Sequence, residues 1–231
     1  MKKTLFLFAA LCIAMGGMAC SDDSPNTDVP PTETPSEEDN ENEDPDTPAS
    51  SMGKTLVVYY SYTNNTHTIV SDLQTQTEAD VLRIEPAEKG LDYAADNYAI
   101  GSALISAIRE NPGDASSYPA IDPVEVQMDE YATVIVAAPL WWSNMAAPMQ
   151  TFLFHYGGKM AGKNIGLIVS SASSGISSVE ADAKRLIPEG NFLSPSLWIR
   201  SSQTSNSHDM IAKWLNEINY SGLTTSEKQE D

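Results

Sequence analysis

A run of hydroxyl and amide side chains follows the first strongly apolar segment of the chain. Residues 55–60 are rich in β-branched and aromatic types, which predicts a buried strand, and a helical pattern begins directly after the polar run. The polar run consists of Ser61, Tyr62, Thr63, Asn64, Asn65 and Thr66. Free backbone N–H groups and the helix dipole favour an anion at the start of a helix, and the hydroxyls add donors without positive charge. The run therefore predicts a site for a phosphate monoester, although the same residue types are common in ordinary strand-to-helix turns.

Two later segments carry residues that fit a ligand at the same edge of a sheet. Residues 133–138 predict a central strand, and it is followed by Pro139, Leu140, Trp141, Trp142 and Ser143. Residues 165–170 predict another strand, and it is followed by Ser171, Ala172 and Ser173. The carboxyl ends of parallel strands meet at one edge, so we expect the three segments to converge. Tryptophans in loops beside a cleft are typical ligand contacts, and the alternative is that they pack as a lid on the end of the sheet.

Motifs for several other chemistries do not occur in the sequence. There is no glycine-rich dinucleotide or Walker A pattern, no G-x-S-x-G and no H-E-x-x-H. His67, His155 and His208 lack the spacing of metal ligands. The 2 cysteines, Cys12 and Cys20, lie near the amino terminus, which excludes disulfide and thiolate chemistry in the rest of the chain. The prediction therefore names no catalytic residue and no metal ligand.

The alternation of strand and helix patterns predicts the fold. Strands are expected at residues 55–60, 81–85, 133–138, 165–170 and 197–199, and helical patterns, including 66–75 and 92–110, lie between and after them. Such alternation predicts a three-layer α/β/α fold, with a five-stranded, doubly wound parallel sheet and helices on both faces. We assign one domain to residues 53–222 and a polar tail to residues 223–231.

The amino-terminal segment predicts export and attachment to a membrane. Residues 1–19 have a basic start and an apolar stretch too short to span a bilayer, which is typical of a signal peptide. They lead into Gly17-Met18-Ala19-Cys20, which resembles a bacterial lipobox and implies a lipid anchor on Cys20; a plain signal peptide is the alternative. Residues 20–52 are rich in acidic residues and proline and contain no lysine or arginine, which predicts a disordered tether. We therefore expect a membrane-anchored extracytoplasmic lipoprotein, at the periplasmic face or the cell surface.

The charge of the chain restricts its partners. The formal net charge is −19 at pH 7, and acidic residues outnumber basic ones in the domain as well as in the tether. This balance argues against nucleic-acid binding and favours a partner protein with a basic surface.

Three motifs in this order resemble the flavodoxin family over about residues 54–220. Residues 61–66 resemble the family's phosphate loop, S/T-x-T-G-N-T, with Asn64 at the place of the glycine. Asparagine tolerates a left-handed backbone better than most residues do. Tyr131 and residues 139–142 resemble the segment that covers the flavin ring, and residues 171–175 resemble the loop on the other side of the ring. The segment 197–200 has no long insertion, which is similar to the short-chain members.

The resemblance implies a cofactor, a sheet order and a role. The cofactor is FMN, held by the residues of the three segments named above, with one tryptophan on the flavin and the other in the protein wall. The strand order is 2-1-3-4-5, and the role is that of a one-electron carrier in an extracytoplasmic redox chain. Two alternatives stay open: an FMN-dependent reductase of NAD(P)H or quinones, and a non-redox binding module that keeps the fold.

Overall fold

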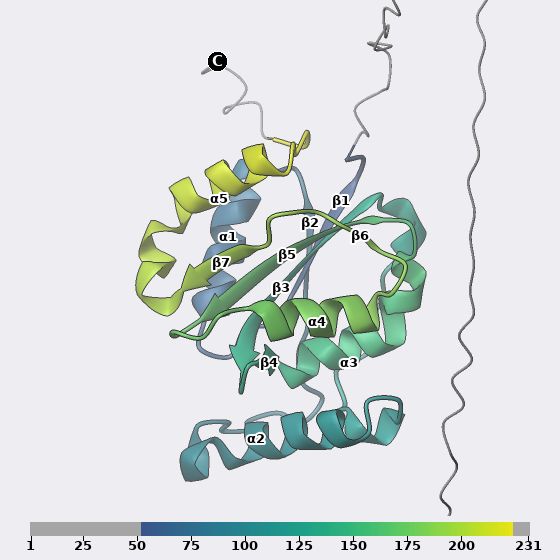
Figure 1. The fold of residues 1–231 in the computed structure, drawn as a ribbon, viewed down its shortest axis with the longest axis vertical. Coiled ribbons are helices and arrows are strands. Elements are labelled where there is room, and N and C mark those ends of the chain that lie inside the picture. The colour runs from purple at the N-terminus through teal and green to yellow at the C-terminus, as the bar shows by residue number, and fades with distance from the viewer. Residues whose placement is uncertain (1–51, 224–231) are drawn as a thin grey trace, which may run out of the picture. The chain divides into compact units, whose positions relative to one another are not determined.

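The computed structural model describes residues 52–223, which are built around one parallel β-sheet with helices on both faces (Figure 1). Its strands are β1 (Thr55–Tyr59), β2 (Asp80–Arg83), β3 (Thr133–Trp141), β5 (Asn164–Ser171), β6 (Asn191–Phe192) and β7 (Leu197–Arg200). The order along the sheet is β2-β1-β3-β5-β6, and β7 also pairs with β5. If β6 and β7 are taken as two parts of one fifth strand, this is the order 2-1-3-4-5, so the predicted fold class is confirmed. The predicted signal peptide, Cys20, the tether up to residue 51 and the tail from residue 224 lie outside the described residues.

The central strands are buried because their sequences are apolar almost without interruption. β1 is buried at every position, and β3 and β5 are buried over most of their length. Val57 of β1 pairs with Ile135 of β3, which pairs in turn with Gly166 of β5, all in parallel register. β2 lies at the edge of the sheet and is more exposed, in agreement with its alternating sequence.

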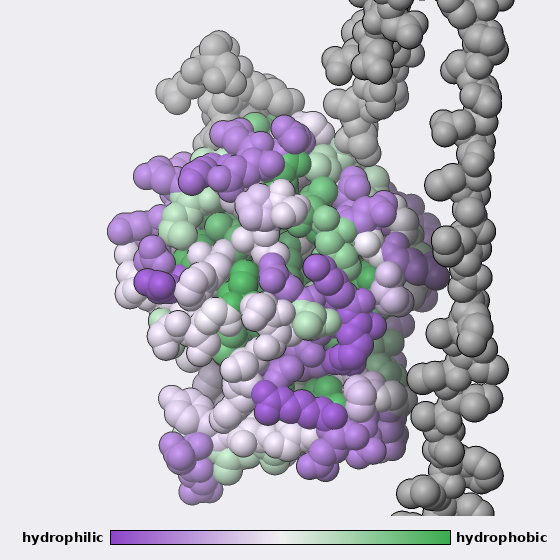
Figure 2. Space-filling model, in the orientation of Figure 1, coloured by the Kyte–Doolittle hydropathy of each residue, from purple (hydrophilic) through white to green (hydrophobic). Residues whose placement is uncertain are grey.

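The helices form two layers that cover the two faces of the sheet. On one face, α1 (Asn65–Gln76) and α5 (Ser207–Glu217) pack on the sheet, and residues such as Ile69 and Trp214 are buried there. On the other face lie α2 (Ala95–Glu110), α3 (Ala147–Tyr156) and α4 (Ser177–Leu186), with Phe152 in the core. The outer surfaces of α4 and α5 are mostly hydrophilic in Figure 2, as expected for amphipathic helices that cover a sheet. No helix within residues 52–223 combines the length and the apolar composition needed to cross a bilayer.

Two predicted segments differ from the structure in ways that affect the site. The helix expected at 92–110 begins at Ala95, and its residues Asp96, Asn97 and Tyr98 have positive φ angles of 50°, 55° and 64°. This left-handed turn places Tyr98 beside Trp142, with 6.3 Å between the ring centroids.

Residues 139–143, expected as a loop after the strand, instead form part of a β-hairpin. β3 continues through Trp141 and pairs in antiparallel fashion with β4 (Asn144–Met145), and Trp142 and Ser143 form the turn between them. The pairing of Leu140 with Met145 and of Trp141 with Asn144 satisfies backbone groups that a loop would leave to other partners.

Both ends of the described chain lie at the amino ends of the strands. The carbonyl of Met52 accepts a hydrogen bond from Thr133, the first residue of β3. Leu223 forms a β-bridge with Thr77, which follows α1. The carboxyl ends of the strands are at the opposite edge of the sheet.

Candidate functional site

A pocket of about 310 Å³ lies at the carboxyl ends of β1, β3 and β5. It brings together parts of all three predicted segments and adds residues from the start of α2 and from the segment after β7. The lining residues are Tyr62, Thr63, Asn65, Tyr93, Tyr98, Gly101, Pro139, Leu140, Trp141, Trp142, Ser170, Ser171, Ala172 and Ser201. We refer to this cavity as the strand-end pocket.

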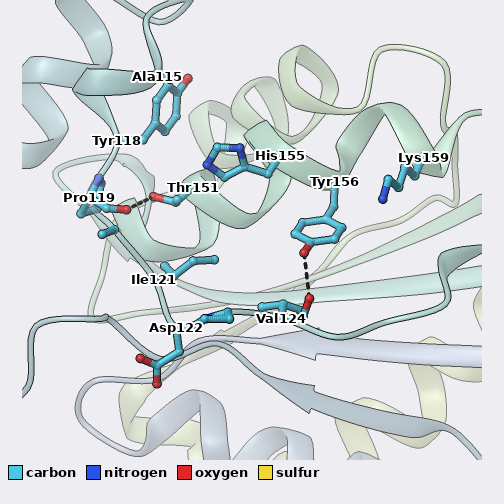
Figure 3. Close-up of a pocket in the computed structure, with 12 residues that line it drawn as sticks. Ala115, Tyr118, Pro119, Ile121, Asp122, Val124, Thr151, His155, Tyr156 and Lys159 are labelled. Carbon is cyan, nitrogen blue, oxygen red and sulfur yellow. Dashed lines mark hydrogen bonds between the residues drawn. The ribbon is translucent and has the colours of Figure 1, made fainter.

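A larger hollow of about 630 Å³ lies elsewhere, between α3 and residues 115–124 (Figure 3). Two of its hydroxyl groups are bonded to its own walls: Thr151 donates to the carbonyl of Pro119 at 2.8 Å, and Tyr156 donates to that of Val124 at 2.9 Å. None of the residues at the strand ends lines it. Because ligands of open parallel sheets bind outside the carboxyl ends of the strands, the smaller strand-end pocket is the candidate site.

The turn before α1 leaves backbone donors free at one side of this pocket. Asn64 caps α1 with φ 65° and ψ −3°, the left-handed conformation that glycine provides in the resembled motif, and its side chain makes no capping hydrogen bond. The amide of His67 donates to Ser61 Oγ at 3.2 Å. Within the described residues, the amides of Asn65 and Thr66 have no hydrogen-bond acceptor. This is the arrangement in which a helix N-terminus can accept an anion.

Five of the predicted site residues do not line the pocket, and some of them support the segments that do. They are Ser61, Asn64, Thr66, Ser143 and Ser173. The hydroxyl of Thr66 is buried and lies 2.8 Å from the hydroxyl of Ser170, so it ties the start of α1 to the end of β5.

The segment after β5 is held by its own hydrogen bonds. Ser171 Oγ accepts a bond from Trp198 Nε1 at 2.8 Å and donates to the carbonyl of Ser174 at 3.0 Å. Ser171 and Ala172 therefore line the pocket in a segment that these hydrogen bonds hold in place.

Aromatic rings form one wall of the pocket. Trp141 is half-buried and contacts Tyr60 and Tyr93, with ring centroids 5.7 Å and 4.9 Å away. Trp142 is 39% exposed and lies on the backbone of α2 at Gly101, where an added Cβ would come within 2.7 Å of the indole ring. Gly101 is thus required for this close approach of helix and ring.

Sequence reasoning missed five lining residues: Tyr93, Tyr98, Gly101, Ser170 and Ser201. A glycine inside a helical pattern often has a packing reason, so Gly101 carried a usable signal. The other four carry no such signal in the sequence: Ser170 lies at the end of a predicted strand, and the two tyrosines reach the pocket through tertiary packing.

The pocket presents hydroxyls and rings but no charge, since none of its lining residues is Asp, Glu, Lys, Arg or His. Burial raises the pKa of the Tyr93 phenol, so it stays neutral at physiological pH. The carboxylate of Asp92, just outside the lining, accepts hydrogen bonds from Tyr62 Oη at 2.8 Å and from the amide of Ala94 at 2.9 Å. These two bonds lower the pKa of Asp92, and the hydrogen bond between Tyr62 and Asp92 raises the pKa of the Tyr62 phenol. Among the residues that the structure describes, no group of three or more His, Cys, Asp or Glu side chains could hold a metal ion.

Comparisons with known proteins bear on the family and the fold of the chain. The flavodoxin family model matches residues 54–218. A candidate flavoprotein from Bacteroides eggerthii is 23% identical, with 73% of this chain and 99% of that chain covered and a TM-score of 0.58. A flavoprotein from Lactobacillus acidophilus, solved in complex with FMN, is 17% identical, with 68% and 99% covered and a TM-score of 0.53. The search of curated proteins gives no significant match.

At these identities the solved structures establish the fold, and the family model establishes the relationship. The matched range contains the phosphate-loop motif and every residue that lines the strand-end pocket. The chain belongs to the flavodoxin family.

Proposed function

We propose that this protein binds FMN in the strand-end pocket and works as a one-electron carrier in an extracytoplasmic redox chain. One observation carries the proposal: the free amides of Asn65 and Thr66, behind the left-handed Asn64, lie at the same sheet edge as an aromatic-walled pocket. A phosphorylated ligand with a planar ring system would use both features at once.

The residues present fit the parts of FMN. The amides of Asn65 and Thr66 and the hydroxyl of Thr63 would hold the phosphate without a cation. Trp141 and Trp142 are nearly perpendicular, with 82° between their ring planes, so one would stack on the flavin ring and the other would form the wall beside it. The relative from Lactobacillus acidophilus, which has the same fold, was solved with FMN bound, and this supports the assignment.

The chain's own contribution to electron transfer is the environment of the pocket. FMN, when bound, supplies the capacity to accept and release electrons one at a time. The uncharged lining makes the gain of negative charge within the pocket unfavourable. No acid or base is needed for such a carrier.

Location and partner are proposed from sequence patterns. The lipobox-like Gly17–Cys20 and the acidic tether support an extracytoplasmic, lipid-anchored protein, and the acidic domain supports a redox partner with a basic surface. Metabolic labelling with a radioactive fatty acid should mark the wild-type chain and not the Cys20→Ser variant. Equal labelling of the two would remove the anchor from the proposal.

A second candidate, the FMN-dependent reductase, is favoured by the rim of the pocket. Tyr98, Ile100 and Trp142 are 51%, 36% and 39% exposed, so apolar surface is available beside the pocket for a planar second substrate such as a quinone. NAD(P)H oxidation in the presence of a quinone, followed with the purified full chain, distinguishes the two roles.

The direct test is a titration of the purified full chain with FMN. We expect tryptophan emission to be quenched and heat to be released, followed by two separate one-electron steps in a redox titration. A single two-electron step together with NAD(P)H turnover would favour the reductase. If FMN causes neither heat release nor quenching, both redox roles are contradicted, and the non-redox binding module is left.

A further inference from the structure

The turn between β3 and β4 holds its backbone in an unfavourable conformation. Trp142 and Ser143 have φ angles of 47° and 68°. Two-residue hairpin turns with positive φ usually contain asparagine and glycine, and a bulky residue in this region is an outlier. Such strain persists only where the surroundings impose it, and it concentrates at functional sites.

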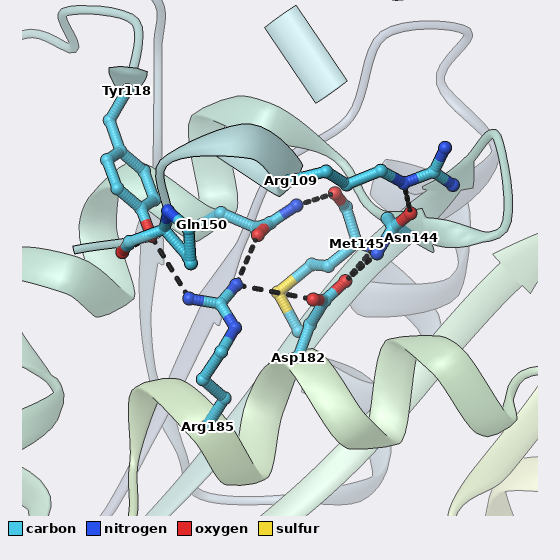
Figure 4. A network of polar contacts seen from close by, with 8 residues as sticks. Arg109, Tyr118, Asn144, Met145, Gln150, Asp182 and Arg185 are labelled. Carbon is cyan, nitrogen blue, oxygen red and sulfur yellow. Dashed lines mark hydrogen bonds and ion pairs between the residues drawn. The ribbon is translucent and has the colours of Figure 1, made fainter. Parts of the chain in front are cut away.

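A guanidinium group from α2 bonds to both sides of this turn. Arg109 Nη2 donates to the carbonyl of Trp142. Arg109 Nε donates to Asn144 Oδ1 at 2.7 Å, as Figure 4 shows. Arg109 is exposed and takes part in no ion pair among the described residues. The hydrogen bonds to the β3–β4 hairpin are therefore the polar contacts that hold the Arg109 side chain within the described residues.

The other side of the hairpin is held from α4 by a buried carboxylate. Asp182 Oδ2 accepts from Asn144 Nδ2 and from the amide of Met145, both at 2.9 Å, and Asp182 is 7% exposed. Its second oxygen lies 3.3 Å from Arg185, which also donates to Gln150 at 2.8 Å. Figure 4 shows these groups as one continuous network across the hairpin.

Helix α2 thus contacts Trp142 at two points. The backbone at Gly101 supports the indole ring, and Arg109 holds the carbonyl of the same residue. The geometry points to Arg109 as a positioning residue: it clamps the β3–β4 turn to α2, keeps the Trp141–Trp142 wall in place, and so sets how tightly the strand-end pocket holds its aromatic ligand. This inference rests on the proposed function only in naming FMN as that ligand.

The clamp itself can be tested without any ligand. In the full chain, Arg109→Met should speed hydrogen exchange in a peptide covering residues 140–146 by about tenfold, the effect of losing a charge-assisted hydrogen bond. Arg109→Lys, which keeps the positive charge but lacks the forked donor geometry of arginine, should restore part of the protection. The matched control is Lys213→Met on α5, which removes the same charge and should leave this peptide unchanged. Equal exchange in Arg109→Met and the wild type would overturn the clamp.

The effect on the ligand is measured in the same variants. FMN should dissociate about tenfold faster from Arg109→Met, with partial rescue in Arg109→Lys and none of this change in Lys213→Met. Thermal unfolding of each variant shows whether the chain is folded at the assay temperature. If the hairpin loosens and FMN dissociates at the wild-type rate, the positioning role is wrong. If the wild type binds no FMN, the proposed function fails. The hydrogen-exchange measurement alone then shows whether Arg109 holds the β3–β4 turn.

Discussion

Replacing Gly101 by alanine should change the shape of the pocket but leave the stability of the fold nearly unchanged. Alanine in a helix interior is favoured over glycine by about 0.8–1.0 kcal/mol. Its Cβ, however, would lie 2.7 Å and 2.9 Å from Cζ3 and Cη2 of Trp142. These atoms are at the far end of the indole, which is 39% exposed, so we expect the ring to move outward rather than the helix to distort.

The two energies nearly cancel. Moving the ring breaks its edge contact with Tyr98, which is worth about 0.5–1.5 kcal/mol. The free energy of unfolding should therefore change by less than about 1 kcal/mol, and the melting temperature by less than about 4 °C. A ring that could not move would instead cost about 1–3 kcal/mol through overpacking.

The pocket should respond more strongly than the stability does. With Trp142 displaced, we expect acrylamide to quench tryptophan emission more efficiently and FMN to bind about threefold to tenfold more weakly. Gly113→Ala is the control, because an added Cβ there meets nothing within 4 Å. A large fall in melting temperature with unchanged quenching, or a displaced ring with unchanged FMN affinity, would refute the reasoning.

Further expectations concern a contact between α1 and β5, a carboxylate and the core. Thr66→Val leaves the Ser170 hydroxyl without its partner, so the free energy of unfolding measured in urea should fall by about 1–3 kcal/mol, and an unchanged midpoint would contradict this. Burial alone would raise the pKa of Asp72, but hydrogen bonds, foremost from His208, outweigh it and lower that pKa. The folded-state pKa therefore lies below the unfolded value of about 3.9, so Asp72 adds stability above that pH, and this stability is lost as the pH falls through the folded pKa. Asp72→Asn should therefore lose less stability at acid pH than the wild type does. Parallel curves of stability against pH for the variant and the wild type would exclude this. Leu153→Ala, at a fully buried position, should cost about 2–5 kcal/mol in thermal unfolding, and a cost below about 1 kcal/mol would mean that α3 does not pack as described.

The sheet and the turn before α1 could be predicted because the sequence around each of them decides its conformation. Residues 134–138 are apolar throughout, which is typical of a strand covered on both faces. Asn64 adopts the left-handed conformation that the resemblance implies, since it stands where the phosphate-loop motif has glycine. These features depend on neighbours in the sequence, so the sequence contains the information.

Trp141 and Trp142 were expected at the site, but the shape of the aromatic wall could not be predicted because contacts between distant segments create it. Trp142 and Ser143 are poor candidates for a turn with positive φ, and the bonds that hold them there come from Arg109, far along the chain. Tyr93 and Tyr98 lie in an irregular segment whose pattern predicts a simple helix. Their place in the pocket follows from packing against the hairpin, which no local pattern encodes.

The position of the chain ends has a consequence for how the protein meets other molecules. Met52 and Leu223 lie at the amino ends of the strands, and the pocket opens at their carboxyl ends. An attachment to the domain at Met52 or Leu223 would therefore lie at the edge of the sheet opposite the pocket. A domain attached to a surface in this way could meet a diffusing protein at the pocket side without first being released from that surface.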